Sequence, residues 1–283
     1  MKKQQALVAG IGMVVLIVFY FFGNTVPRLK KSASGDSTAR ISQSIDIKTI
    51  LDADKSKLTP QQLATVNRLE NSVIRGNVRD QQIEADRELA LYWKDSVENG
   101  FLAYAYYTGE LAKLENSEKS LTFAAQLFLN TLRSQDNPAL RSWMAGESRD
   151  LFERAAQLNP DNDSTKIGLG ATYIFGGTGE PMEVMKGVQS ILAVIQKDSL
   201  NMYAQLMLGL GGIESGQYDK AIPRLLKVVY YDPGNLEAVL SLAEAYEKSG
   251  NTAAAKIWYG QGIKLTNNSE LITAIKERLG SLK

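Results

Sequence analysis

The side chains available for chemistry in this chain are carboxylates, amines, guanidinium groups and hydroxyls, because its 283 residues include no histidine and no cysteine. This composition removes the commonest general base, thiol nucleophiles, the usual zinc ligands and haem axial histidines. Acidic pairs such as Glu244 and Glu247 fall on the surface of an expected helix, where solvated structural roles predominate. We therefore predict a protein that is not an enzyme and has no metal site and no cofactor.

Two glycine clusters are superficially similar to phosphate-binding loops. Residues 176–179 read Gly-Gly-Thr-Gly, but they lack the Gly-Lys-Ser/Thr ending and the preceding strand of such a loop. Residues 209–212 read Gly-Leu-Gly-Gly and fall inside an expected helix. We interpret the first cluster as a lengthened turn between helices and the second as a place where two helices pack closely.

The elements that must position any functional surface are helices, and a repeat in the sequence predicts them. Leu208-Gly209, Gly216 and Ala221 recur thirty-four residues later as Leu242-Ala243, Gly250 and Ala255. Small residues let two helices approach, the glycine in the turn can adopt a left-handed conformation, and Asp232-Pro233 ends the second helix. A period of this length predicts stacked helical hairpins. A third copy is in register through Gly187, Ile191, Val194, Asp198 and Asn201.

With this pattern the chain resembles the tetratricopeptide repeat (TPR) family. The family's Leu-Gly-x-x-Tyr appears at 169–173, five residues earlier than the period requires, so the turn over 176–181 is expected to be longer. Another second helix is expected to end at Asn159-Pro160, and residues 270–282 fit a capping helix. The resemblance implies an all-α, right-handed superhelix of TPR hairpins.

Residues 59–137 are expected to be helical but match the repeat poorly. Thr59-Pro60-Gln61-Gln62 predicts a capped helix start and Gly76 a stop, with further helices over about 78–98, 101–115 and 117–134. Aromatic residues gather here: Tyr92, Trp93, Phe101, Tyr104, Tyr106, Phe123 and Phe128. We interpret them as the core between degenerate repeats, and the alternative is a pocket for a small ligand over residues 92–128.

Residues 6–22 are apolar, glycine or tyrosine throughout, with lysines before them and Arg28, Lys30 and Lys31 after them. At about 1.5 Å per residue such a helix just spans a bilayer. We predict a single transmembrane anchor within residues 1–27. The alternative is a cleavable signal peptide, for which Gly23 and Thr25 form a poor cleavage site. The short basic amino terminus favours a periplasmic location for the rest of the chain, and the cytoplasmic side remains the alternative.

Residues 28–58 are rich in serine, aspartate, lysine and threonine, and we interpret them as a flexible tether, with a short helix or docking strand as the alternative. The predicted organisation is thus an anchor (1–27), a tether (28–58), a degenerate helical region (59–137) and TPR repeats with a capping helix (138–283). The first forty residues hold six basic residues and one acidic residue, and the remainder holds 26 basic and 30 acidic residues. This balance excludes the basic surface that nucleic-acid binding requires.

The TPR resemblance also implies a concave groove, lined by the first helices of successive repeats, that binds a peptide from a partner. By register the groove positions are Ser164, Ile167, Ala171, Tyr203, Leu206, Leu210, Ile213, Glu237, Leu240 and Glu244. Leu206 and Leu210 stand where some members have the lysine and asparagine that hold a terminal carboxylate, so we expect an apolar or amphipathic ligand. Alternatively, helices within residues 60–134 cover these leucines.

These observations predict a non-catalytic, membrane-anchored scaffold that binds a protein or peptide client. By its layout the chain is similar to anchored TPR proteins of the bacterial cell envelope that serve secretion, envelope assembly or cytochrome maturation. A permanent structural subunit of a membrane complex and a small-molecule sensor are the alternatives.

Overall fold

The computed structural model describes residues 45–75, 79–176 and 180–282. Within these ranges the chain forms thirteen helices and no strand, so the all-α prediction is confirmed. The predicted membrane segment, residues 6–22, lies outside the described residues. No helix in the described part of the chain is both long enough and apolar enough to cross a membrane.

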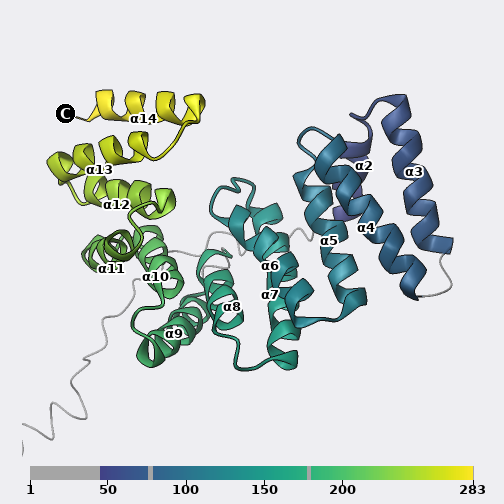
Figure 1. Ribbon diagram of the computed structural model, residues 1–283, viewed down its shortest axis with the longest axis horizontal. Coiled ribbons are helices and arrows are strands. Elements are labelled where there is room, and N and C mark those ends of the chain that lie inside the picture. The colour runs from purple at the N-terminus through teal and green to yellow at the C-terminus, as the bar shows by residue number, and fades with distance from the viewer. Residues whose placement is uncertain (1–44, 76–78, 177–179, 283) are drawn as a thin grey trace, which may run out of the picture. The chain divides into compact units, whose positions relative to one another are not determined.

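In Figure 1 the helices carry these labels: α2 (Ile47–Lys55), α3 (Pro60–Arg75), α4 (Arg79–Ser96), α5 (Phe101–Glu115), α6 (Glu118–Leu132), α7 (Pro138–Leu158), α8 (Asp163–Phe175), α9 (Pro181–Lys197), α10 (Met202–Glu214), α11 (Tyr218–Tyr231), α12 (Leu236–Lys248), α13 (Thr252–Lys264) and α14 (Ser269–Ser281).

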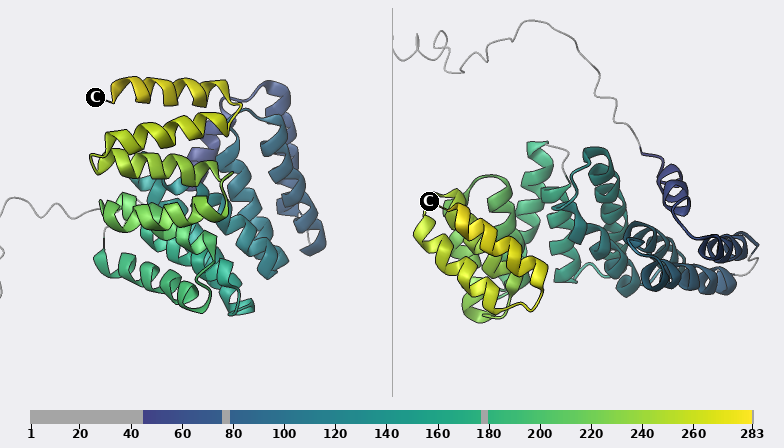
Figure 2. Two further views of the ribbon diagram at one scale, coloured as in Figure 1. Left: turned by 60° about the vertical axis from the view of Figure 1, so that its left-hand side comes forward. Right: turned by 90° about the horizontal axis from the view of Figure 1, so that it is seen from above.

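From α4 onward, consecutive helices pair as hairpins: α4 with α5, α6 with α7, α8 with α9, α10 with α11, and α12 with α13. The second helix of each hairpin also contacts the first helix of the next, and α14 packs on α13 as the expected cap (Figures 1 and 2). The helix expected to end before Asn159 is α7, and its partner is α6. The boundary expected at residue 137 therefore falls inside a hairpin.

The turns of the repeat have the predicted chemistry. Gly216 and Gly250, thirty-four residues apart, have φ of 71° and 85°, a left-handed conformation in which a side chain is strained. Helix α11 ends at Tyr231, directly before Asp232-Pro233, as expected. Asparagine side chains accept hydrogen bonds from backbone N–H groups at the starts of α8, α10, α12 and α14, which satisfies donors that a helix start leaves free. These asparagines are Asn162, Asn201, Asn235 and Asn268.

Small residues mark the closest helix crossings. A Cβ atom built on Gly170 of α8 would lie 2.8 Å from the carbonyl oxygen of Gly187 in α9. One built on Gly209 of α10 would lie 2.8 Å from Cγ of Leu225 in α11. Because both distances are shorter than a carbon atom tolerates, only glycine fits at these positions in the observed packing.

Helix α3 begins with the capping interactions that the sequence predicts. The backbone N–H of Gln62 donates to the Thr59 hydroxyl at 3.3 Å, and the Gln62 amide oxygen accepts from the Thr59 N–H at 3.0 Å. Gly76, the expected stop, lies outside the described residues. The tether expected to reach residue 58 is interrupted, because residues 47–55 form α2. Its Leu51 is buried in a core shared with α3, α4 and α5, so the short-helix alternative holds there.

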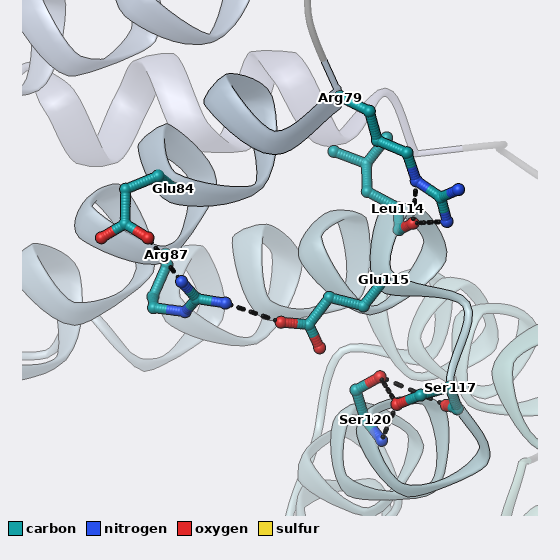
Figure 3. A network of polar contacts seen from close by, with 7 residues as sticks. All are labelled: Arg79, Glu84, Arg87, Leu114, Glu115, Ser117 and Ser120. Carbon is teal, nitrogen blue, oxygen red and sulfur yellow. Dashed lines mark hydrogen bonds and ion pairs between the residues drawn. The ribbon is translucent and has the colours of Figure 1, made fainter.

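Polar side chains join α4 to α5 beside the start of α6 (Figure 3). The Arg79 guanidinium donates to the backbone carbonyl of Leu114 through Nε at 2.8 Å and also through Nη2. Arg87 of α4 pairs with Glu115 of α5 at 2.9 Å. Ser117 then caps α6. These contacts hold the end of α5, where its last carbonyls lack helix partners.

The aromatic residues between 92 and 128 pack mainly as core. Trp93 and Phe128 are buried in two separate hydrophobic clusters, and Tyr104 and Tyr106 pack half-buried around the first. Phe101 and Phe123 are exposed. The core interpretation therefore fits this region better than a ligand pocket built from all of these rings.

Candidate functional site

The apolar centre of the predicted concave groove is buried inside the protein. Leu206, Leu210 and Ile213 are 7%, 1% and 3% exposed and belong to the large core that runs from α5 to α12. Ile167 and Ala171 are fully buried in the same core. None of these five side chains can contact a ligand in this conformation. These side chains are buried because neighbouring helices use the same apolar stripe for packing, and the helices that pack on α10 are α8, α9, α11 and α12.

Helix α6 lies against the polar margin of this groove. The Tyr203 hydroxyl donates to the Gln126 amide oxygen at 3.0 Å, across 77 residues of sequence. Burial raises the pKa of this tyrosine. Arg133, at the end of α6, reaches Glu237 of α12 at 3.5 Å. Helix α6, from residues 60–134, therefore contacts the groove margin at Tyr203 and Glu237.

The remaining groove positions are dispersed. Leu240 is half-buried and packs with the carboxyl-terminal cluster around α13 and α14. Glu244 pairs with Lys248 at 2.7 Å on the surface of α12. Ser164 is exposed at the start of α8. The structure thus does not bring the predicted residues together as one open surface.

A different apolar hollow is open to solvent, and we call it the α9–α11 cleft. It has a volume of about 1010 Å³. One wall is α9, the floor is α10 with Ile174 of α8, and the other wall is the start of α11. Its lining residues are Ile174, Pro181, Val184, Met185, Val188, Leu192, Gln205, Leu208, Gly211, Gly212, Ser215, Gln217, Asp219, Lys220, Pro223 and Arg224.

The α9 wall arises from a second apolar stripe on that helix. Gly187, Ile191 and Val194 are buried against α8 and α10, whereas Val184 and Val188 lie on the cleft side and are half-buried. Met185 in the same wall is 55% exposed. The stripe follows helical spacing and extends over three turns. Sequence periodicity alone assigns such residues to the core, so it did not indicate this cleft.

The cleft carries charge at its α11 side. The Arg224 guanidinium is half-buried and donates to the amide oxygen of Gln205 at 2.9 Å. Burial lowers the pKa of Arg224. Lys220 is held by Gln217 at 2.7 Å, and Asp219 also lines this side. With two cations and one carboxylate, the lining has one net positive charge.

Acidic side chains in the described part of the chain are the groups to consider for metal binding or acid–base chemistry. No group of three or more acidic side chains there is placed to hold a metal ion. The most perturbed carboxyl is Asp86 of α4, which is 3% exposed, and burial followed by the nearby Glu110 raises its pKa to about 6. It faces Glu110 of α5 and does not line the α9–α11 cleft.

Comparison with solved structures finds other repeat proteins at low similarity. YrrB, described as a TPR protein with an unusual peptide-binding site, is 15% identical, with a TM-score of 0.40, covering 68% of this chain and 91% of YrrB. MamA from Desulfovibrio magneticus RS-1 is 15% identical, with a TM-score of 0.43, covering 66% and 97%. A thermophilic TPR protein from Thermus thermophilus is 16% identical, with a TM-score of 0.42, covering 58% and 91%.

A comparison with curated proteins gives no match. A family model described as tetratricopeptide repeat matches residues 213–279, which include α11, α12 and α13. This is the part of the chain in which the thirty-four-residue period, the left-handed Gly216 and Gly250 and the asparagine caps coincide. Residues 213–279 are therefore supported as tetratricopeptide repeats.

Proposed function

We propose that the protein is a non-catalytic TPR scaffold that binds an apolar segment of a partner protein in the α9–α11 cleft. The observation that carries this proposal is an open apolar hollow of about 1010 Å³ between two successive hairpins. Hollows of this size that are mostly apolar, with a few polar groups, are typical of binding sites. Methionine in the wall suits such a role, because its flexible side chain adapts to different partners.

We further propose that residues 6–22 anchor the chain in a membrane of the bacterial cell envelope, with the repeats on the periplasmic side. The uncharged run and its basic flanks support this. Alkaline extraction of membranes tests it: the full chain is expected to stay with the membrane, and a version without residues 6–22 to be released. Protease treatment of spheroplasts then tests the side, since periplasmic repeats are digested without lysis.

Affinity purification tests the binding site. The full-length protein is compared with a Met185→Glu, Val188→Glu variant that places two charges on the α9 wall, after circular dichroism has shown equal helix content. We expect partners of the unchanged protein to be lost. The matched control is Leu91→Glu, at an exposed apolar residue on α4 outside the cleft. Retention of every partner by the cleft variant contradicts the cleft as the binding site.

A permanent structural subunit is the second candidate, and one observation favours it. Apolar side chains of α11 and α13 are exposed around two adjoining shallow hollows, of about 800 and 280 Å³, which share Val229, Pro233 and Trp258 in their linings. These side chains are Leu226, Tyr230, Tyr231, Ile257 and Leu265. Exposed apolar patches often mark interfaces. A large particle whose size does not depend on concentration in light scattering, disrupted by Ile257→Glu, would favour this candidate.

A further inference from the structure

Arg224 is a half-buried cation for which the described part of the chain supplies no carboxylate partner. Its hydrogen bond goes to the neutral amide of Gln205, and Asp219, although it lines the same cleft, makes no ion pair with it. Lys113, a comparable half-buried cation, is paired. It meets Glu147 at 2.9 Å, in addition to an acidic neighbour on its own helix. Arg224 therefore differs from Lys113, because no negative charge compensates its own charge.

The free-energy cost of burying the unpaired Arg224 guanidinium indicates that the cleft lacks an anion. A guanidinium that loses water without gaining an anion is destabilised, in agreement with the lowered pKa of Arg224. Its planar group has five N–H donors in a fork that matches a carboxylate. A carboxylate arriving with a ligand would restore the missing charge and hydrogen bonds in a site partly shielded from water, where such bonds are strong.

The shape of the cleft indicates the form of the ligand. Lining residues on α9 run from Pro181 to Leu192, about 16 Å along a helix axis, or three turns. Two helical walls and a helical floor present an apolar trough of the kind that takes an amphipathic helix. Because the α9 wall is apolar and the charged α11 wall gives the lining a net positive charge, an apolar helix with one acidic residue matches both properties.

We propose that the α9–α11 cleft binds a helical segment of a partner protein that carries an apolar stripe and one acidic side chain, whose carboxylate pairs with Arg224. This inference rests on the proposed function and specifies the chemistry of its partner. In this inference the apolar α9 wall provides most of the affinity, and Arg224 selects among apolar segments.

Fluorescence anisotropy with designed peptides tests the inference on the full-length protein in mild detergent. The probe is a labelled helical peptide of alanine, glutamine and leucine, with leucines on one face, blocked termini and a single glutamate. A second probe has glutamine in place of that glutamate. We expect the glutamate peptide to bind about tenfold more tightly, as one charge-assisted contact implies. Arg224→Gln should abolish the preference, Arg224→Lys should retain part of it, and Arg154→Gln, at an exposed arginine on α7, should leave it unchanged.

The outcomes separate this inference from the proposed function. Equal binding of the two peptides to the unchanged protein, or a preference that persists in Arg224→Gln, overturns the role of Arg224. If Met185→Glu, Val188→Glu still abolishes binding in that case, the cleft remains a docking site for apolar segments. If neither peptide binds, the inference and its assumption of a helical ligand are both overturned. Affinity purification of partners tests the scaffold function independently.

Discussion

A methyl group added at Gly187 should prevent α8 and α9 from packing as they do. The two helices cross with the backbone of Gly187 against that of Gly170, and the new Cβ would overlap the Gly170 carbonyl oxygen and lie 2.9 Å from Cβ of Tyr173. Neither neighbour can turn aside, because one is main chain and the other is the first atom of a buried side chain. The Gly187→Ala variant must therefore move a whole helix.

The expected magnitude combines two opposing effects. Overpacking of a rigid core costs about 1–3 kcal/mol and sometimes more, and a backbone contact belongs at the upper end. Alanine gains about 0.5–1 kcal/mol over glycine within a helix. We expect a net loss of about 2–2.5 kcal/mol in the free energy of unfolding. In a domain of this size that corresponds to a fall of roughly 5–10 °C in Tm.

Urea unfolding followed by circular dichroism measures this loss, and Gly260→Ala provides the matched control. Gly260 lies inside α13, and a Cβ built there meets no atom within 4 Å. The same chemical change should stabilise the protein at Gly260 by about 0.5–1 kcal/mol and destabilise it at Gly187. If Gly187→Ala is as stable as the unchanged protein while Gly260→Ala gains stability, the close crossing of α8 and α9 is refuted.

Two further predictions concern stability. The raised pKa of Asp86 means that the folded protein holds a proton there between pH 3.8 and about 6, so this group lowers stability as pH rises through that window. At about 1.4 kcal/mol per pH unit over roughly two units, Asp86→Asn should be up to about 3 kcal/mol more stable than the unchanged protein at pH 7 and equal to it below pH 4. A stability difference that is constant across pH in urea titrations contradicts this. Asn235→Ala removes the acceptor of the Ala238 N–H bond, 2.9 Å long, and should cost about 1 kcal/mol, measured as a lower urea midpoint, whereas Asn235→Gly should cost only a few tenths.

Local features of the fold followed from the sequence because they depend on neighbours a few residues away. The left-handed glycines, the capping box of Thr59 and Gln62, and the helix end before Asp232 are decided by backbone sterics and short-range hydrogen bonds. The α2 helix was less predictable. Its nine residues are polar in composition, and it is the burial of Leu51 against distant helices that holds it.

The candidate site could not be predicted in the same way. Apolar residues at helical spacing indicate a buried face, but they do not indicate which neighbouring helix covers it. Leu206 and Val188 both belong to such stripes, and the structure buries the first in the core and leaves the second at an open cleft. No local signal distinguishes them.

The sequence by itself determined a helical repeat of thirty-four residues, its turns and caps, and the absence of histidine and cysteine chemistry, because each of these follows from residue type and short-range geometry. Only the tertiary structure decided which apolar helix faces are buried and which line an open cleft. Tyr203 meets Gln126 and Glu237 meets Arg133 across 77 and 104 residues, contacts that depend on how successive hairpins stack. The same stacking leaves α9 and α11 apart and Arg224 without a carboxylate, since small differences in helix packing accumulate over several repeats.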